Sequence, residues 1–153
     1  YMFEARNVCK KNSIQNISFG VRKGEILGFF GLEGAGIQEV SRMIFGLESF
    51  DQGEIYYNNK KIPKVMPEKM IENKIVYLNN NRKTAGLLFD MPVADNMAMP
   101  VLKKISKWTI ININLLKAHA QKYIERFSIV LGSSFDKPSS VSGGKQQKLM
   151  LSI

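Results

Sequence analysis

Apolar and polar residues alternate along the first half of the chain in a way that predicts strands. Residues 14–21 alternate regularly, which predicts a strand with one buried face, and residues 3–8 alternate weakly, which predicts a strand at a sheet edge. Residues 25–30 form an apolar run that predicts a buried strand, and residues 74–78 form a shorter apolar strand. Residues 54–57 follow the turn sequence Asp-Gln-Gly and complete the predicted β portion.

Helical spacing of apolar residues dominates elsewhere. Residues 37–45 carry this spacing, and Gly46 follows at the place where a glycine often ends a helix. Residues 67–71 form a shorter predicted helix with a proline in its first turn. Beyond residue 93 the spacing recurs over residues 93–105 and 115–131, and it predicts a largely helical subdomain.

The order of these elements predicts an α/β fold in three parts. Residues 1–88 are expected to hold the β portion and part of an α/β core, residues 89–141 a helical subdomain, and residues 142–153 the start of a further helix. A chain of 153 residues with 44% hydrophobic content suits one globular domain or part of a larger one. No apolar stretch approaches the roughly 20 residues that span a bilayer.

The net charge of +9 narrows the function only slightly. The Lys and Arg residues are scattered, often as pairs, without a long basic run or interleaved aromatic residues, so most are interpreted as solvated surface groups. Nucleic-acid binding would rest on this charge alone. The single Cys9 and the lack of a signal-peptide pattern at the start predict a cytosolic protein.

A glycine-rich turn between a predicted strand and a predicted helix is the first candidate site. Strand, glycine turn and helix form the layout of a phosphate-binding loop, in which backbone N–H groups and a helix N-terminus face an anion. Gly31 and Gly36 match the glycines of G-x-x-x-x-G-K-[ST], but Ile37 and Gln38 replace its Lys and Ser or Thr. The candidate nucleotide-binding residues are Gly31, Leu32, Glu33, Gly34, Ala35, Gly36, Ile37 and Gln38.

A second candidate anion site begins at Ser142. Its hydroxyl, the closely approachable N–H groups of Gly143 and Gly144, and the dipole of the helix that follows all favour a negative charge. Taken alone, Ser-Gly-Gly more often marks a helix capped by its serine, but its place after a glycine loop and a helical segment favours a ligand role. The candidate residues are Ser142, Gly143, Gly144, Lys145 and Gln146.

Together the two sites resemble the ATP-binding cassette of ABC transporters. Residues 31–36 stand at the Walker A position, and residues 141–146 match the family signature L-S-G-G-Q with Lys145 as an insertion. More narrowly, the chain resembles the second, C-terminal cassette of the two-cassette ATPases of ribose, galactose and similar sugar importers. That closer match lies in the patterns G-L-x-G-A-G, Y-x-x-E-D-R-K-x-x-G-L and S-G-G-N-Q-Q-K, and those second cassettes lack the Walker lysine.

Several positions depart from this family pattern. Asn80 stands at the glutamine-loop position, where second cassettes often carry Glu, so a carboxylate is missing there. Residues 12–13 are Asn-Ser where an adenine-stacking aromatic is expected; Tyr1 and Phe3 are the nearest aromatic candidates and are better explained as inward-packing strand residues. The only histidine, His119, lies in the helical region and is not expected to be the family's switch histidine.

The resemblance implies a fold and a mechanism. The fold would be a P-loop NTPase core with an antiparallel β portion and an inserted α-helical subdomain, truncated before the Walker B strand. In the family two cassettes pair head to tail, and the signature of one closes over ATP on the Walker A loop of the other. By this resemblance, Ser142, Gly143 and Gly144 would contact the γ-phosphate of ATP on a first cassette, expected in the same full-length chain.

The resemblance also implies cofactors and partners. ATP would bind weakly at the chain's own loop, Mg²⁺ would enter only in the complete assembly, and this fragment is not expected to hydrolyse ATP alone; we assign no catalytic residue and no metal ligand. A membrane permease would contact Arg82, Lys83 and residues 89–92, and a periplasmic or lipoprotein sugar-binding protein would act indirectly. The implied location is cytoplasmic, peripheral on the inner face of a bacterial cell membrane, with no nucleic-acid partner.

Two other functions stay open at this point. The three loop glycines could be a dinucleotide fingerprint with Asp51 as the ribose acceptor, although their spacing is not G-x-G-x-x-G and Asp51 falls in a predicted turn. Alternatively, the chain keeps the cassette fold but has only a structural or regulatory role without nucleotide.

Overall fold

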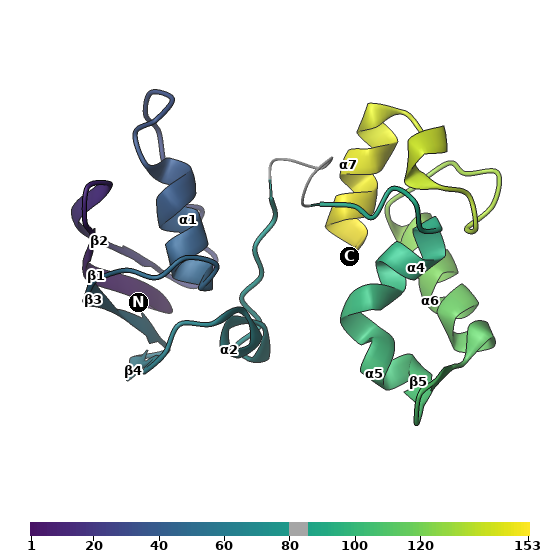
Figure 1. Ribbon diagram of the computed structural model, residues 1–153, viewed down its shortest axis with the longest axis horizontal. Helices are drawn as coiled ribbons and strands as arrows, with labels where there is room; N and C mark the ends of the chain where they lie inside the picture. Colours follow the sequence, from purple (N-terminus) through teal and green to yellow (C-terminus); the bar gives the residue numbers. More distant parts are fainter. Residues whose placement is uncertain (80–85) are drawn as a thin grey trace. The chain divides into compact units, whose positions relative to one another are not determined.

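A computed structural model describes residues 1–79 and 86–153 of the chain (Figure 1). The chain divides into two compact units, Tyr1–Tyr77 and Leu78–Ile153. We call them the sheet unit and the helical unit and describe each by itself. Within the described residues, no helix is long and apolar enough to cross a membrane.

The sheet unit is built on a four-stranded antiparallel sheet in the order β2-β1-β3-β4. The strands are β1 (Phe3–Lys10), β2 (Ile14–Val21), β3 (Gln52–Tyr57) and β4 (Lys60–Lys61). Strand β1 was expected at a sheet edge, and this prediction is wrong, because Ala5 pairs with Phe19 on one side and Ile55 on the other. Its weak alternation reflects irregular pairing, with register shifts on both sides of the strand.

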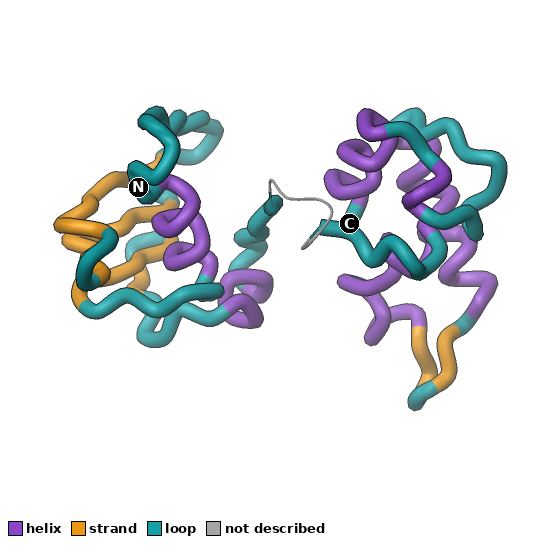
Figure 2. Tube along the Cα trace, turned by 45° about the horizontal axis from the view of Figure 1, so that its top comes forward, coloured by secondary structure: helices purple, strands orange, loops and turns teal. Residues whose placement is uncertain are grey.

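One face of this sheet is covered by helix α1 (Ile37–Phe45), as Figure 2 shows. Val40 and Met43 lie on the buried side of α1 and join Ile55 of β3 in the hydrophobic core. Helix α2 (Pro67–Glu72) adds Met70, which is fully buried in the same cluster. The first helix was predicted from apolar spacing and the second from its N-terminal proline, and both are confirmed within one residue of their expected bounds.

The two apolar segments predicted as strands, residues 25–30 and 74–78, are not strands in the structure. Ile26 is 97% exposed, Phe30 is fully exposed and Val76 is 79% exposed. A strand needs a neighbouring strand to pair with its backbone N–H and C=O groups, and the described residues offer these segments none. Their apolar composition is typical of parallel strands that are covered on both faces, which is why the pattern predicted burial.

The helical unit contains a broken series of helices around one core. Helix α4 (Val93–Ala98) runs through a 3₁₀ turn, η1 (Met99–Val101), into α5 (Leu102–Ile105). The later elements are β5 (Ser106–Lys107), β6 (Ile110–Ile111), α6 (Ile113–Arg126), η2 (Pro138–Ser140) and α7 (Gly143–Ser152). The core residues drawn from these elements are Val93, Met97, Ile105, Leu116, Ala120 and Leu149.

The helical prediction holds for this unit with two differences. Helix α6 ends at Arg126, because Ser128 takes a left-handed conformation at φ 49°, and the apolar residue Ile129 is buried from a loop instead. The short hairpin of β5 and β6 had no counterpart in the predicted elements. Two-residue strands carry too little alternation to be recognised from sequence.

Candidate functional site

The glycine loop, residues 31–36, connects the exposed segment 25–30 to helix α1. Gly34 and Gly36 both have positive φ, at 84° and 85°, a conformation that favours glycine. A Cβ on Gly36 would also lie 2.4 Å from Ile14 Cδ1, so the end of the isoleucine side chain would have to shift to admit one. Within the loop the Ala35 N–H donates to the Leu32 carbonyl at 3.0 Å, which closes a tight turn.

Helix α1 begins directly at this turn with Gly36 as its N-cap, and no side chain caps it. The first intrahelical bond is donated by the Val40 N–H to the Gly36 carbonyl at 2.9 Å. The N–H groups of Ile37, Gln38 and Glu39 therefore precede the helix's own acceptors. Together with the positive end of the helix dipole, they form the kind of anion-binding site that the sequence predicted.

Ile37 removes the side-chain cation that such an anion-binding site usually has. A Cβ on Gly31 would lie 3.3 Å from Ile37 Cδ1, so the isoleucine side chain lies against the first glycine of the loop. The pattern G-x-x-x-x-G-K-[ST] places an ammonium group at this position, and here it is replaced by a half-buried apolar side chain. Gln38 is exposed and supplies an amide, which carries no charge. The loop thus keeps its backbone donors and lacks a side-chain cation.

The far end of helix α1 is held to the sheet by an ion cluster around Glu48. Lys10 Nζ lies 2.5 Å from Glu48 Oε2, and Arg42 Nε donates to the other carboxylate oxygen. Hydrogen bonds from Lys10 and then Arg42 hold the pKa of Glu48 below its usual value near 4.5. The hydrogen bond to Glu48 likewise raises the pKa of Arg42. These contacts link the C-terminal end of α1 to β1.

The turn between β1 and β2 borders an open hollow of about 450 Å³. Because Ile14 approaches Gly36, this turn lies next to the glycine loop, and it contains residues 12–13, where an adenine-stacking aromatic was expected. The residues around the hollow include no aromatic one: Cys9, Lys10, Lys11, Asn12, Ile14, Gln15, Asn16, Asp51 and Gln52. Phe3 is buried against Phe19 in the core, and Tyr1 lies beside Arg22, whose guanidinium carbon is 5.5 Å from the ring centroid.

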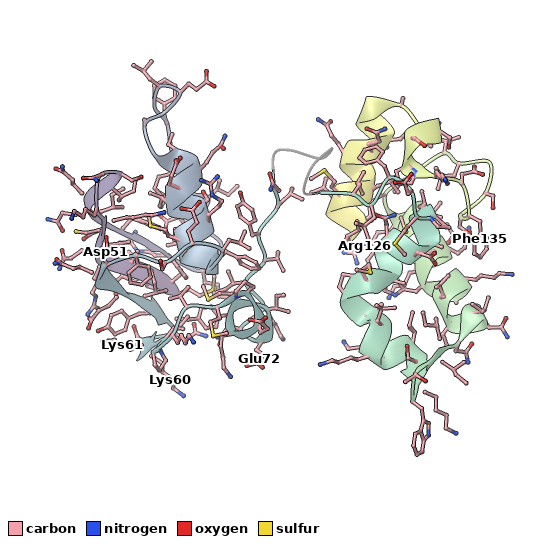
Figure 3. The ribbon with its side chains drawn as sticks, viewed as in Figure 1. Asp51, Lys60, Lys61, Glu72, Arg126 and Phe135 are labelled. Carbon is pink, nitrogen blue, oxygen red and sulfur yellow. The ribbon has the colours of Figure 1, made fainter. Side chains whose placement is uncertain are left out.

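Asp51, labelled in Figure 3, was the ribose acceptor of the dinucleotide alternative. Its Oδ2 accepts a hydrogen bond from the Lys11 N–H at 2.7 Å, and its own N–H donates to the Cys9 carbonyl at 2.8 Å. These bonds tie Asp51 to the end of β1. The carboxylate therefore has a structural partner within the sheet unit.

The second predicted site is the start of helix α7 in the helical unit. Ser142 is the N-cap residue with extended backbone (φ −62°, ψ 158°), but its hydroxyl makes no capping hydrogen bond. The side chain is exposed, and a Cβ on Gly144 would meet nothing within 4 Å. The alternative that Ser142 serves only to cap the helix is therefore not supported. An exposed hydroxyl and an open glycine stand together at the positive end of the helix.

Gln146 fixes the geometry of this helix start, a role that the sequence did not reveal. Its Nε2 donates to the Pro138 carbonyl at 3.0 Å and to the Val141 carbonyl at 3.1 Å. Lys148 Nζ donates to the Ser128 carbonyl at 3.1 Å, and Leu149 is buried in the core. The sequence did contain an indication of this role. Gln146 follows Ser142 by four residues, and one helical turn therefore places it on the same side of the helix.

Asn96 is a second residue whose role only the structure reveals. It is 3% exposed, and its Oδ1 accepts from the Leu88 N–H at 2.8 Å. Its Nδ2 lies within 3.2 Å of the carbonyls of Leu88, Met91 and Pro92. This one side chain organises residues 88–92, which overlap the segment predicted to face a permease. A polar residue inside the apolar spacing of 93–98 was the only signal in the sequence.

The remaining predicted residues divide by location. Asn80, Arg82 and Lys83 lie outside the described residues. His119 is half-buried on α6, with its ring centroid 4.8 Å from that of Tyr123. The structure thus shows two separate helix starts with exposed donors, Gly36–α1 in the sheet unit and Ser142–α7 in the helical unit. Each is described only within its own unit.

Comparison with curated proteins finds relatives that are ATP-binding proteins of sugar import. The chain is 35% identical over 150 residues to the ribose import ATP-binding protein RbsA of Bacillus cereus, covering 98% of this chain and 30% of that protein. It is 42% identical over 142 residues to the xylose import ATP-binding protein XylG of Thermoanaerobacter pseudethanolicus, covering 92% of the chain and 28% of that protein. The chain therefore spans about 30% of the length of these relatives.

Solved structures agree on the fold. An ATP-binding cassette in a dimeric post-hydrolysis state bound to ADP and Pi superposes with a TM-score of 0.77 at 18% identity, covering 99% of this chain and 68% of that one. A second ABC transporter cassette gives a TM-score of 0.79 at 22% identity, covering 99% and 63%. The expected P-loop cassette fold is thus confirmed. Since the family model described as ABC transporter matches residues 14–153, the chain belongs to the ABC transporter family.

Proposed function

We propose that this chain is the second nucleotide-binding cassette of a sugar importer's ATPase, and that it works mainly through its signature. The observation that carries the proposal is a contrast between two helix starts. At α1 an isoleucine lies against the loop glycine, where a phosphate-binding lysine is expected. At α7 the Ser142 hydroxyl is exposed and makes no capping bond. The relatives that import ribose and xylose support the substrate class.

The chain's own loop fits a phosphate only in part. Gly34 and Gly36 shape the turn, and the first N–H groups of α1 precede their helix's own acceptors. Without the lysine, no side-chain charge reaches toward β- and γ-phosphates. The described residues hold no cluster of three or more His, Cys, Asp or Glu that could hold a metal ion. This loop is therefore a weak ATP-binding site, and Mg²⁺ would be held in the complete assembly.

The signature fits a phosphate more fully. Phosphoryl transfer depends on positioning the phosphates and neutralising charge, and hydroxyl and backbone N–H donors at a helix N-terminus do both. The Ser142 hydroxyl and the Gly144 N–H stand before the first intrahelical donor, the Gln146 N–H, which is bonded to the Ser142 carbonyl at 3.0 Å. In this proposal they complete a site whose lysine, metal ligands and water-activating acid belong to a first cassette.

The proposal includes the partners implied by the family. A membrane permease would meet Arg82, Lys83 and residues 89–92, and Asn96 holds the last of these segments in place. A sugar-binding protein would act through the permease. The assembly would then lie at the cytoplasmic face of the membrane.

The test is ATP turnover by the full-length two-cassette protein. Ser142→Arg places a bulky side chain at the signature, and we expect a loss of at least a hundredfold, as for removal of an oxyanion-type donor. Ser139→Arg is the matched control, because Ser139 is exposed on η2 three residues earlier and should leave turnover within about twofold. Ile37→Ala should also change turnover by less than about twofold, since the loop is not the working site.

The outcomes separate the alternatives. Unchanged turnover in the Ser142→Arg protein would contradict the proposal. If turnover and nucleotide binding survive both the Ser142 and the Ile37 changes, the chain has a structural or regulatory role. A larger loss from Ile37→Ala than from Ser142→Arg would reverse the assignment of the two sites.

A further inference from the structure

The hairpin between α5 and α6 is not explained by either predicted site. Ser106 pairs with Ile111 and Lys107 with Ile110, which leaves Trp108 and Thr109 in the turn. We call residues 103–111 the arm. The hairpin extends away from the helices of its unit, as Figures 1 and 2 show.

The tip of the arm exposes apolar side chains that contribute little to the core. Trp108, the only tryptophan of the chain, is 94% exposed, and Ile110 is 76% exposed. Trp108 also takes a left-handed conformation at φ 60°, where turns usually place Asn, Asp or Gly. A bulky residue at such a position gains nothing from packing and is disfavoured by its backbone. Its large apolar surface is available for a partner.

The charge around the arm has a single sign. Residues 96–124 contain five lysines and neither Asp nor Glu. Lys103, Lys104 and Lys107 are exposed, and none of them forms an ion pair with the residues that the structure describes. Three exposed lysines without an ion pair among the described residues therefore lie within five residues of the exposed Trp108. Their attraction to a negative surface is not offset locally.

We propose that the arm is a docking site for an anionic lipid surface. Tryptophan lies at the headgroup level of bilayers, because its ring is amphipathic, and lysine stems extend along apolar surface while their heads reach phosphates. Lysine is instead depleted at protein–protein interfaces, so the arm's composition matches lipid better than a protein groove. This inference goes beyond the proposed ATPase role and does not depend on nucleotide binding at either helix start.

The chain provides its own reporter for the test. Because Trp108 is the only tryptophan, its fluorescence reports on the arm alone. With the 153-residue chain, we expect a blue-shifted Trp108 emission on vesicles that contain phosphatidylglycerol, and quenching of this emission by brominated acyl chains. Vesicles of phosphatidylcholine alone should give no shift. Added salt should weaken the binding, because exposed charges are screened.

Variants separate the arm from net charge. Each lysine near an anionic surface contributes about a fivefold gain in affinity, so Lys103→Gln, Lys104→Gln and Lys107→Gln together should weaken vesicle binding on the order of a hundredfold. The control triple is Lys11→Gln, Lys60→Gln and Lys64→Gln, which removes the same charge from exposed positions of the sheet unit. Lys60, labelled in Figure 3, lies on β4. The vesicle affinity of this control triple should fall by less than about threefold, because only long-range attraction is lost.

Three results would overturn the proposal. The first is an unshifted Trp108 emission on anionic vesicles. The second is an equal loss from the arm triple and the control triple, which would reduce the effect to net charge. The third is arm-dependent capture of a purified permease in detergent without any binding to anionic vesicles, which would identify a protein partner. None of these measurements depends on ATP turnover, so failure here is distinct from failure of the proposed function.

Discussion

Asn96 holds the loop that leads into the helices of the helical unit. Its amide satisfies the Leu88 N–H and lies within hydrogen-bond distance of the Leu88, Met91 and Pro92 carbonyls, all from a side chain that is almost completely buried. Backbone groups at buried positions need partners, and residues 88–92 have no strand or helix of their own to supply them. The asparagine takes the place of that missing secondary structure.

Replacing Asn96 should therefore destabilise the helical unit. Asn96→Leu keeps a similar side-chain size and leaves several backbone groups unpaired, which costs about 2–3 kcal/mol in the free energy of unfolding. Asn114→Leu is the matched control, because Asn114 is exposed in the first turn of α6 and should change stability by less than about 0.5 kcal/mol. Urea unfolding followed by circular dichroism measures both. Equal midpoints for the two variants would show that the buried amide does not hold residues 88–92.

Residue-level prediction from the sequence succeeded where the chemistry was local. Gly36 was recognised as a loop glycine, and the structure gives it a positive φ that a side chain would strain. Ser142 was recognised as a helix start, and it is one. Asn96 and Gln146 were missed as anchors because their partners are backbone groups of other segments, whose positions depend on the folded chain.

At the scale of elements, helix α1 is held at its C-terminal end by charge. Glu48 receives hydrogen bonds from Lys10 on β1 and from Arg42 on α1, and its side chain is only about a quarter exposed. The pKa of Glu48 is thereby lowered from its usual value near 4.5. A carboxyl whose pKa is lower in the folded than in the unfolded state stabilises the fold above its unfolded pKa. That stabilisation is lost as the pH falls through the folded pKa.

This sign gives a pH-dependent prediction. Glu48→Gln should lower the free energy of unfolding by about 1 kcal/mol at pH 7, because two charge-assisted bonds are weakened. The difference from the unsubstituted chain should shrink as the pH falls below 4.5, where the unfolded-state carboxyl becomes protonated, and vanish below the lowered pKa of Glu48 in the folded chain. Thermal unfolding at several pH values measures it. Glu33→Gln removes the same charge from an exposed loop position and should leave the pH profile unchanged; a parallel shift in both variants would indicate a net-charge effect instead.

Helices were predicted better than strands, for a physical reason. The apolar spacing that predicted α1 and the N-terminal proline that predicted α2 are intrinsic to a helix, whose hydrogen bonds are made within the segment. Residues 25–30 and 74–78 have the composition of strands, but a strand forms only against a partner, and the described residues pair neither segment. The short arm hairpin was missed for the opposite reason, since its pairing exists without a periodic signal.

At the scale of the whole molecule, the sheet unit has two exposed apolar segments, one between β2 and α1 and one after α2. Residues 25–30 lead into the glycine loop and residues 74–78 lie at the end of the unit, and both segments are largely exposed. Each segment has one aromatic contact with the rest of the unit: Phe29 against Phe19 at 4.9 Å and Tyr77 against Phe45 at 5.8 Å between ring centroids. The cassettes of known structure are longer, and this chain covers 63–68% of them.

The exposed segment allows a comparison of identical substitutions in two settings. Ile26 is 97% exposed and Ile55 is 1% exposed, so in the 153-residue chain Ile26→Ala should cost less than about 0.5 kcal/mol and Ile55→Ala about 2–5 kcal/mol. If the chain is part of a two-cassette protein, as proposed above, we expect further strands of that longer protein to cover residues 25–30, because such apolar runs are stable as strands only when paired and buried. The cost of Ile26→Ala should then rise into the range of Ile55→Ala. Chemical denaturation of both variants in both proteins measures the four values. An Ile26→Ala cost that stays small in the longer protein would show that this segment remains uncovered, and the glycine loop would then be joined to an unpaired segment in both settings.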